Sequence, residues 1–192
     1  MKAKFGLVAL LVSAMLVSAP LVGCGDMNSP KATVASLDKA LKTGDKSAAR
    51  AAFNIKGENG SKAIDAMLDA VIASQKLQKA AEAKFGQDAK GAFAKDAPMA
   101  GIDKMLAESK ENVTENTATF GDMNLVKVDG KWLITTDSET VSAKALPMLN
   151  AMAKAMGELT SEIDAGKYKN LANAQDALRS KMMNAIVNAM FK

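Results

Sequence analysis

The first residue that could do chemistry is Cys24, the only cysteine in a chain of 192 residues. A cysteine thiolate is both a nucleophile and a metal ligand, so a lone cysteine is an obvious candidate for a reactive group. Cys24 is flanked by glycines in the stretch Leu21-Val22-Gly23-Cys24-Gly25, and it directly follows an apolar run over residues 5–22. Lys2 and Lys4 precede that run. A basic start, an apolar run and small residues near a cleavage point are typical of an export signal.

The residues Leu21-Val22-Gly23-Cys24 resemble the bacterial lipobox, in which the thiol is linked to diacylglycerol and the signal is cut before the cysteine. The resemblance implies a signal peptide over 1–23, an acylated Cys24 and a membrane as partner. The chain would then lie in the cell envelope on the extracytoplasmic side. Several acyl chains together anchor a protein stably. The alternative is an uncleaved anchor helix, because the apolar run approaches the length of a membrane span.

The rest of the composition excludes the commonest catalytic groups. The chain contains no histidine, which rules out Ser-His-Asp and Cys-His nucleophiles as well as histidine-based metal sites. No stretch has the spacing of a calcium loop or the glycines of a phosphate loop. With Cys24 acylated there is no thiolate ligand either. The sequence therefore predicts no catalytic, metal-binding or cofactor-binding residues, and no cofactor.

The charged residues also give no clear site. The formal net charge is +4, but Lys2 and Lys4 are lost with the signal and no basic stripe remains, so we do not expect nucleic-acid binding. Acidic side chains that fall on predicted helix surfaces are Glu139, Glu158, Glu162 and Asp164. Hydrolysis by paired carboxylates needs two of them to converge in a cleft, which spacing alone cannot show.

The first half of the chain reads as helices. After a tether over 24–32, with a helix start at Ser29-Pro30, apolar spacing predicts helices over 30–43 and 48–53. The stretch 57–60, Gly-Glu-Asn-Gly, reads as a break, and Ser61 as the cap of a long third helix that ends at Gly86. A short helix is expected around Ile102.

The pattern then changes to strands. Asp129-Gly130 lies between two apolar runs, and a two-residue turn of this composition predicts a hairpin that pairs Lys127 with Trp132. Trp132 should be a core anchor of the sheet. A further strand within 112–121, turning near Asn116, gives a meander of three or four antiparallel strands. One face of the hairpin carries Leu125, Lys127, Trp132 and Ile134, and the other carries Val126, Val128, Lys131 and Leu133.

Helical spacing returns after Asp137 and predicts two helices, 140–165 and 170–190, joined at Gly166. Isolated helices of this length need a packing partner, so we expect the helical hairpin 140–192 to fold back onto the domain, where Val126 and Leu133 offer an apolar face. The expected whole is one helix-rich α+β domain over 33–192. Met148, Met152 and Met156 read as core of the helix pair or, alternatively, as an adaptable partner groove.

Two stretches, 29–53 and the Asp-Gly-Lys-Trp hairpin at 125–134, resemble envelope proteins of the nuclear transport factor 2-like (SnoaL-like) superfamily. The resemblance implies a curved sheet around a pocket. The chain departs from it in leaving no room for a strand hairpin after the second helix and in adding the C-terminal helices. Catalytic members use a buried Asp, His or Tyr, whereas this chain has no His and its one tyrosine, Tyr168, falls between the last two helices. The resemblance implies a fold and not an enzyme.

Three classes of function remain open. The first is a non-catalytic, lipid-anchored envelope protein that binds a protein or a small ligand. The second is an enzyme with a pocket built from carboxylates or lysine, which a deep pocket holding a carboxylate of raised pKa would favour. The third is an assembly role for the C-terminal helices, which an exposed apolar groove on those helices would favour.

Overall fold

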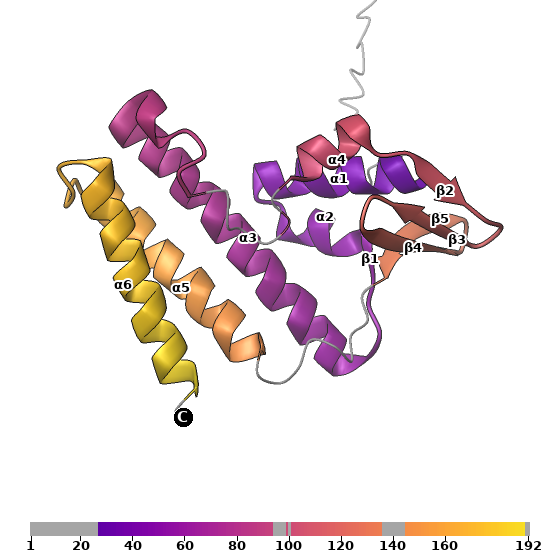
Figure 1. The fold of residues 1–192 in the computed structure, drawn as a ribbon. Helices are drawn as coiled ribbons and strands as arrows, with labels where there is room; N and C mark the ends of the chain where they lie inside the picture. The colour runs from indigo at the N-terminus through magenta and orange to yellow at the C-terminus, as the bar shows by residue number, and fades with distance from the viewer. Residues whose placement is uncertain (1–26, 94–98, 100, 136–144, 191–192) are drawn as a thin grey trace, which may run out of the picture.

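The computed structural model describes residues 27–93, 99, 101–135 and 145–190 and has the helix-rich α+β architecture expected (Figure 1). Helices make up most of the first half, a sheet follows, and two helices end the chain. The helices are α1 (Pro30–Thr43), α2 (Lys46–Ala51), α3 (Gly57–Phe85), the short 3₁₀ helix η1 (Gly86–Ala89), α4 (Ile102–Glu108), α5 (Ala145–Asp164) and α6 (Leu171–Met190). The strands are β1 (Phe53–Asn54), β2 (Glu111–Val113), β3 (Thr117–Phe120), β4 (Met123–Val128) and β5 (Lys131–Thr135).

The sheet has five strands in the order β1-β5-β4-β3-β2 and is mixed, not purely antiparallel. Strands β2 to β5 form the antiparallel meander, while the short β1 pairs in parallel with β5 through Phe53 and Ile134. The expectation that the second helix runs to Phe53 is wrong, because α2 ends at Ala51 and the Ala52 carbonyl accepts a hydrogen bond from Ile134 N. Phe53 is buried in the sheet core and pairs with Ile134, and aromatic residues such as phenylalanine are common in strands.

The β4–β5 hairpin has the register that its turn predicts, with Lys127 opposite Trp132. Asp129 and Gly130 have φ of 49° and 80°, the positive values that a two-residue turn of this kind needs at both positions. Trp132 is 4% exposed. Its carbonyl accepts a 2.7 Å hydrogen bond from Thr33 Oγ1, so α1 holds this strand directly. Lys127 Nζ lies 5.9 Å from the centroid of the Trp132 ring.

Residues 27–32, which were expected to form part of a tether, are packed against the domain. Ser29 caps α1 by accepting a hydrogen bond from Ala32 N, and Pro30 occupies the first turn, where its missing N–H costs nothing. Met27 is already buried, and its carbonyl accepts a 3.0 Å hydrogen bond from Trp132 N. Residues 27–32 therefore belong to the folded body.

Helix α3 begins at Gly57 and not at Ser61, so residues 57–60 are helical and do not form the expected break. Ser61 does not cap the helix, because its hydroxyl instead accepts a hydrogen bond from Arg50 of α2. Arg50 also forms an ion pair with Asp65 of α3, with Nε 2.9 Å from Oδ1. These contacts join the first turns of α3 to α2.

Helix α3 is shared by two separate apolar clusters. Its first half packs with α1, α2, α4 and the sheet around buried residues that include Leu37, Leu41, Leu68, Phe120 and Trp132. Its second half packs with α5 and α6 around buried residues that include Leu77, Ala81, Met156, Leu159 and Ile163. The hairpin of α5 and α6 lies on the side of α3 away from the sheet (Figure 1).

The expectation that the C-terminal helices cover the second face of the sheet is wrong. On that face Val128 is exposed, and Val126 and Leu133 are only half-buried. Helix α5 packs along α3 instead. The reason is that α3 offers a second apolar strip over several turns, whereas on the sheet face Lys131 and Thr117 stand among Val126, Val128 and Leu133. The expected helix start at 140 lies outside the described residues.

Candidate binding surface

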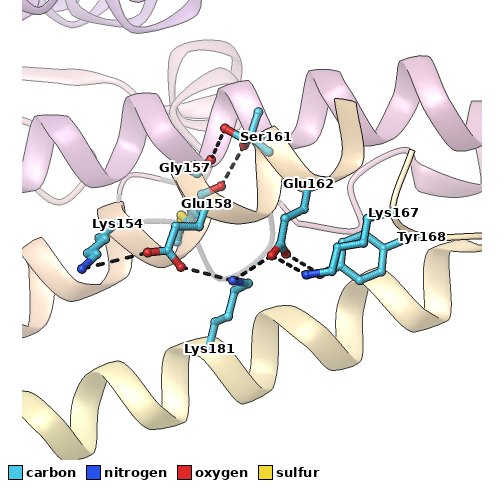
Figure 2. Close-up of polar contacts among 10 residues, drawn as sticks. Lys154, Gly157, Glu158, Ser161, Glu162, Lys167, Tyr168 and Lys181 are labelled. Carbon is cyan, nitrogen blue, oxygen red and sulfur yellow. Dashed lines mark hydrogen bonds and ion pairs between the residues drawn. The ribbon is translucent and has the colours of Figure 1, made fainter. Parts of the chain in front are cut away.

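Helices α5 and α6 are held together by a charged network on one side of their seam (Figure 2). Lys181 of α6 reaches between two carboxylates of α5, with its Nζ 3.2 Å from Glu158 and 3.3 Å from Glu162. Lys154 lies 4.0 Å from the other oxygen of Glu158. Two of the four acidic residues considered in the sequence, Glu158 and Glu162, do converge, but around a lysine and not around a substrate cleft.

Glu162 is the centre of this network. It accepts hydrogen bonds from Lys167 Nζ at 2.6 Å and from the Tyr168 hydroxyl at 2.5 Å, both from the loop that joins the helices. The hydrogen bond from Lys167, with those from Tyr168 and Lys181, lowers the pKa of Glu162 from 4.5 to about 2. Burial, and secondly the Glu162 carboxylate, raises the pKa of the Tyr168 phenol.

These shifts fit a structural clamp better than an acid–base pair. A carboxyl group that donates protons near neutral pH needs a raised pKa, and Glu162 has the opposite. Tyr168 orients Glu162, and Gly166, with φ of 73°, allows the chain to turn between the helices. The network therefore fixes how α5 and α6 align along one another.

The methionines of α5 become more exposed toward the start of the helix. Met156 is buried, Met152 is half-buried and Met148 is 40% exposed. The two readings of these methionines thus apply to different positions, since Met156 is core and Met148 lies at the surface.

Helix α6 carries apolar side chains on two sides of its last turns. Leu178 packs in the C-terminal cluster, and Leu178, Met182 and Ile186 are all half-buried, whereas Met183 and Val187 are 58% and 46% exposed. Met183, Ile186 and Val187 have the i, i+3, i+4 spacing that places side chains on one helix face. We call these three residues the α6 patch. Among the described residues five large apolar side chains are exposed, and Met148, Met183 and Val187 are three of them.

A shallow groove runs beside the charged network on the same pair of helices. Its volume is about 390 Å³, and Ala151, Ala155 and Ala185 line it together with Lys154, Glu158, Lys181, Asn184 and Asn188. Short alanine side chains between longer polar ones leave this depression in the helix surface.

A second cleft, of about 440 Å³, lies between α1, α3 and α4. Its polar side chains are largely bonded to the protein itself. Lys42 pairs with Asp38 and Asp103, Lys79 donates to the Lys42 carbonyl, and Gln78 bonds to the backbone of Ala89 and Phe93. These contacts hold the three helices together and leave few groups in the cleft to recognise a ligand.

The sequence-predicted residues end up in separate places. Cys24 and Glu139 lie outside the described residues, while Asp129, Gly130 and Trp132 form the strand hairpin and its core anchor. Sequence reasoning missed Lys181 as the link between the helices, and it missed the α6 patch. The four-residue spacing of Met183 and Val187 was the available signal, because residues so spaced lie on one face of a helix.

Within the described ranges, no group of three or more Asp, Glu, Cys or His side chains is placed to hold a metal ion. No helix in this part of the chain has the length and apolar character needed to span a membrane.

Comparison of the chain with protein-family models, with curated proteins and with solved structures found no match.

Proposed function

We propose that this chain is a non-catalytic, lipid-anchored protein of the bacterial cell envelope that binds a partner protein through the α6 patch. The export signal and the lipobox-like residues before Cys24 support the anchor. The observation that carries the binding function is the exposed pair Met183 and Val187 on the outer side of α6, with the half-buried Ile186 beside them.

Single exposed apolar residues are ordinary on protein surfaces, but apolar residues that continue around a helix usually face a partner. In the last turns of α6, the inward side is occupied by contacts with α5, and the outer side carries the patch. Methionine side chains adapt their shape to different neighbours. A partner that lays an apolar helix or ridge along α6 would bury all three residues of the patch at once.

The position of the patch supports the same function. Met27, the first described residue, is bonded to β5, while the hairpin of α5 and α6 lies across α3 from the sheet (Figure 1). A chain anchored just before Met27 would therefore present the patch on the side remote from its attachment.

We also propose that the body around the sheet is a divergent nuclear transport factor 2-like domain. The two-residue strand β1 follows the second helix, at the place where that superfamily has a strand hairpin. The Asp-Gly turn and Trp132 of the β4–β5 hairpin support the relation further. No catalytic residue follows from it.

The anchor is tested by the mass of the mature chain purified from membranes. It should begin at Cys24 and carry acyl chains, and an intact Met1 would contradict the proposal.

The binding surface is tested with the double variant Met183→Gln/Val187→Gln, compared with the matched control Asn173→Gln/Ser180→Gln on exposed polar positions of α6. Both should melt like the parent chain, because all four side chains are exposed. Native electrophoresis of solubilised membranes should show a complex larger than the single chain, lost only in the patch variant. A complex made of this chain alone would identify a second copy as the partner. A complex that survives in the patch variant, or no complex in the parent, would overturn the proposal.

A further inference from the structure

We propose that the end of the sheet formed by the β4–β5 turn rests directly on the membrane surface, so that the domain is held against the bilayer and does not hang on a flexible tether. The inference rests on acylation of Cys24 in the proposed function. It assigns a lipid-facing surface to Lys127, Val128 and Lys131, none of which has a role in the partner surface.

The argument begins with the length of chain between the lipid and the folded body. Met27 is 8% exposed, packs in the sheet core and accepts the hydrogen bond from Trp132 N. Only two residues, Gly25 and Asp26, separate Met27 from Cys24. Because an extended chain spans at most about 3.6 Å per residue, the Cα atoms of Cys24 and Met27 are no more than about 11 Å apart.

The next step is where Met27 lies on the body. Its partner Trp132 is the second residue of β5, immediately after the turn at Asp129-Gly130. The turn between β2 and β3 reaches the same end of the sheet, since Lys127 N donates a 2.9 Å hydrogen bond to the Asn116 carbonyl. An acylated Cys24 whose Cα lies within about 11 Å of the Cα of Met27 therefore brings this end of the sheet to the headgroups.

The side chains at this end suit a position at the headgroups. Val128 is exposed, and the exposed Lys127 and Lys131 stand beside it. Lysine stems can lie along apolar surface while the ammonium group stays among polar headgroups. The acidic residues Asp129 and Glu115 lie at the same end of the sheet, so the positive and negative charges there nearly cancel. The covalent lipid anchor, more than electrostatic attraction to the headgroups, therefore holds this end at the membrane.

The orientation has a consequence for the partner surface. Helices α5 and α6 lie across α3 from the sheet (Figure 1). With the β4–β5 turn on the bilayer, the α6 patch would be reached from the aqueous side, where a second envelope protein could bind it without competing with lipid.

The test uses the acylated chain in vesicles of phosphatidylethanolamine and phosphatidylglycerol that contain a lipid spin-labelled at its headgroup. Because the thiol of Cys24 is acylated, an introduced cysteine is the only free thiol, and it can carry one fluorescent label. Val128→Cys is compared with Ser180→Cys on the exposed side of α6. Lys131→Cys is a second reporter at the turn in case Val128→Cys folds poorly.

We expect headgroup quenching to be several-fold stronger at positions 128 and 131 than at position 180. A Gly/Ser linker of about 20 residues, with a root-mean-square span of roughly 25 Å, inserted between Gly25 and Asp26 should remove the difference. Equal quenching at the two ends, or stronger quenching on α6, would overturn the proposal. A chain that fails to float with the vesicles would show that the lipid anchor itself is absent, which is a distinct result and would overturn both proposals.

Discussion

Replacing Leu159 with alanine should loosen the C-terminal helices strongly. Leu159 is fully buried in the cluster that α5 forms with α6 and the second half of α3, beside Leu77 and Ile163. Truncating a leucine at such a site removes its apolar transfer energy and leaves a cavity, which together cost about 3–4 kcal/mol. Since 1.4 kcal/mol corresponds to about a tenfold change, opening of the hairpin should become roughly 10²- to 10³-fold more frequent.

The assay is native-state hydrogen exchange followed by mass spectrometry, with Leu37→Ala as the matched variant. Leu37 is also fully buried, but it lies in the sheet cluster on the other side of α3. If α5 and α6 open without the sheet, Leu159→Ala should speed exchange of their amides, and Leu37→Ala should leave those amides unchanged. An equal acceleration of α5 and α6 amides in both variants would refute the reasoning, because the hairpin would then open only when the whole molecule unfolds.

Three further predictions follow from the same contacts. Trp132→Ala should lower the free energy of unfolding in urea by about 3–5 kcal/mol, because the ring is buried against α1 and the sheet core; unchanged stability would show that the ring is not a core anchor. The folded state lowers the pKa of Glu162 from 4.5 to about 2, so its contribution is complete above about pH 5 and is lost as the pH falls toward 2. Glu162→Gln should therefore weaken the helix pair at neutral pH and flatten its acid sensitivity, measured as the exchange of α6 amides from pH 6 to pH 3 after correction for intrinsic rates; the same acid sensitivity in both chains would speak against the clamp. Cys24→Ser should leave the protein out of the membrane pellet after cell fractionation, and equal sedimentation of both chains would contradict acylation at this residue.

The strand hairpin could be predicted in detail because its turn is decided locally. Asp129 and Gly130 are the residue types that tolerate positive φ, and a two-residue turn fixes the pairing of every residue in the following strand. The alternation of side chains then places Trp132 on the same face as Leu125 and Ile134.

The strand β1 and the start of α3 could not be predicted in the same way. Two residues, Phe53 and Asn54, carry no periodic signal, and their partner β5 is remote in sequence. Gly57 and Gly60 argue against a helix by intrinsic propensity. Contacts of Arg50 with Ser61 and Asp65, together with burial of Gly60, favour the helix nonetheless.

The element against which the C-terminal helices pack could also not be predicted from the sequence. The stripe through Met152, Met156 and Leu159 shows that α5 must bury one side, but both α3 and the sheet had apolar surface to offer. Only the folded structure shows that α5 packs against α3 and that the α6 patch lies on the outer side. No feature of the sequence distinguishes Lys181 from other surface lysines. Its role depends on the packing of α6 against α5, which brings it to Glu158 and Glu162.

The most direct test of a lipid-anchored binding protein is photo-crosslinking in intact cells from position 187 of the acylated chain. A photoreactive amino acid replaces Val187 in one variant and the exposed Asn188 in the other, so that the two probes are adjacent in sequence but point about 100° apart around α6. The account predicts one discrete adduct from position 187, found in the membrane fraction and lost in the Cys24→Ser background, with none from position 188. No adduct at position 187, or the same adducts from both positions, would contradict it.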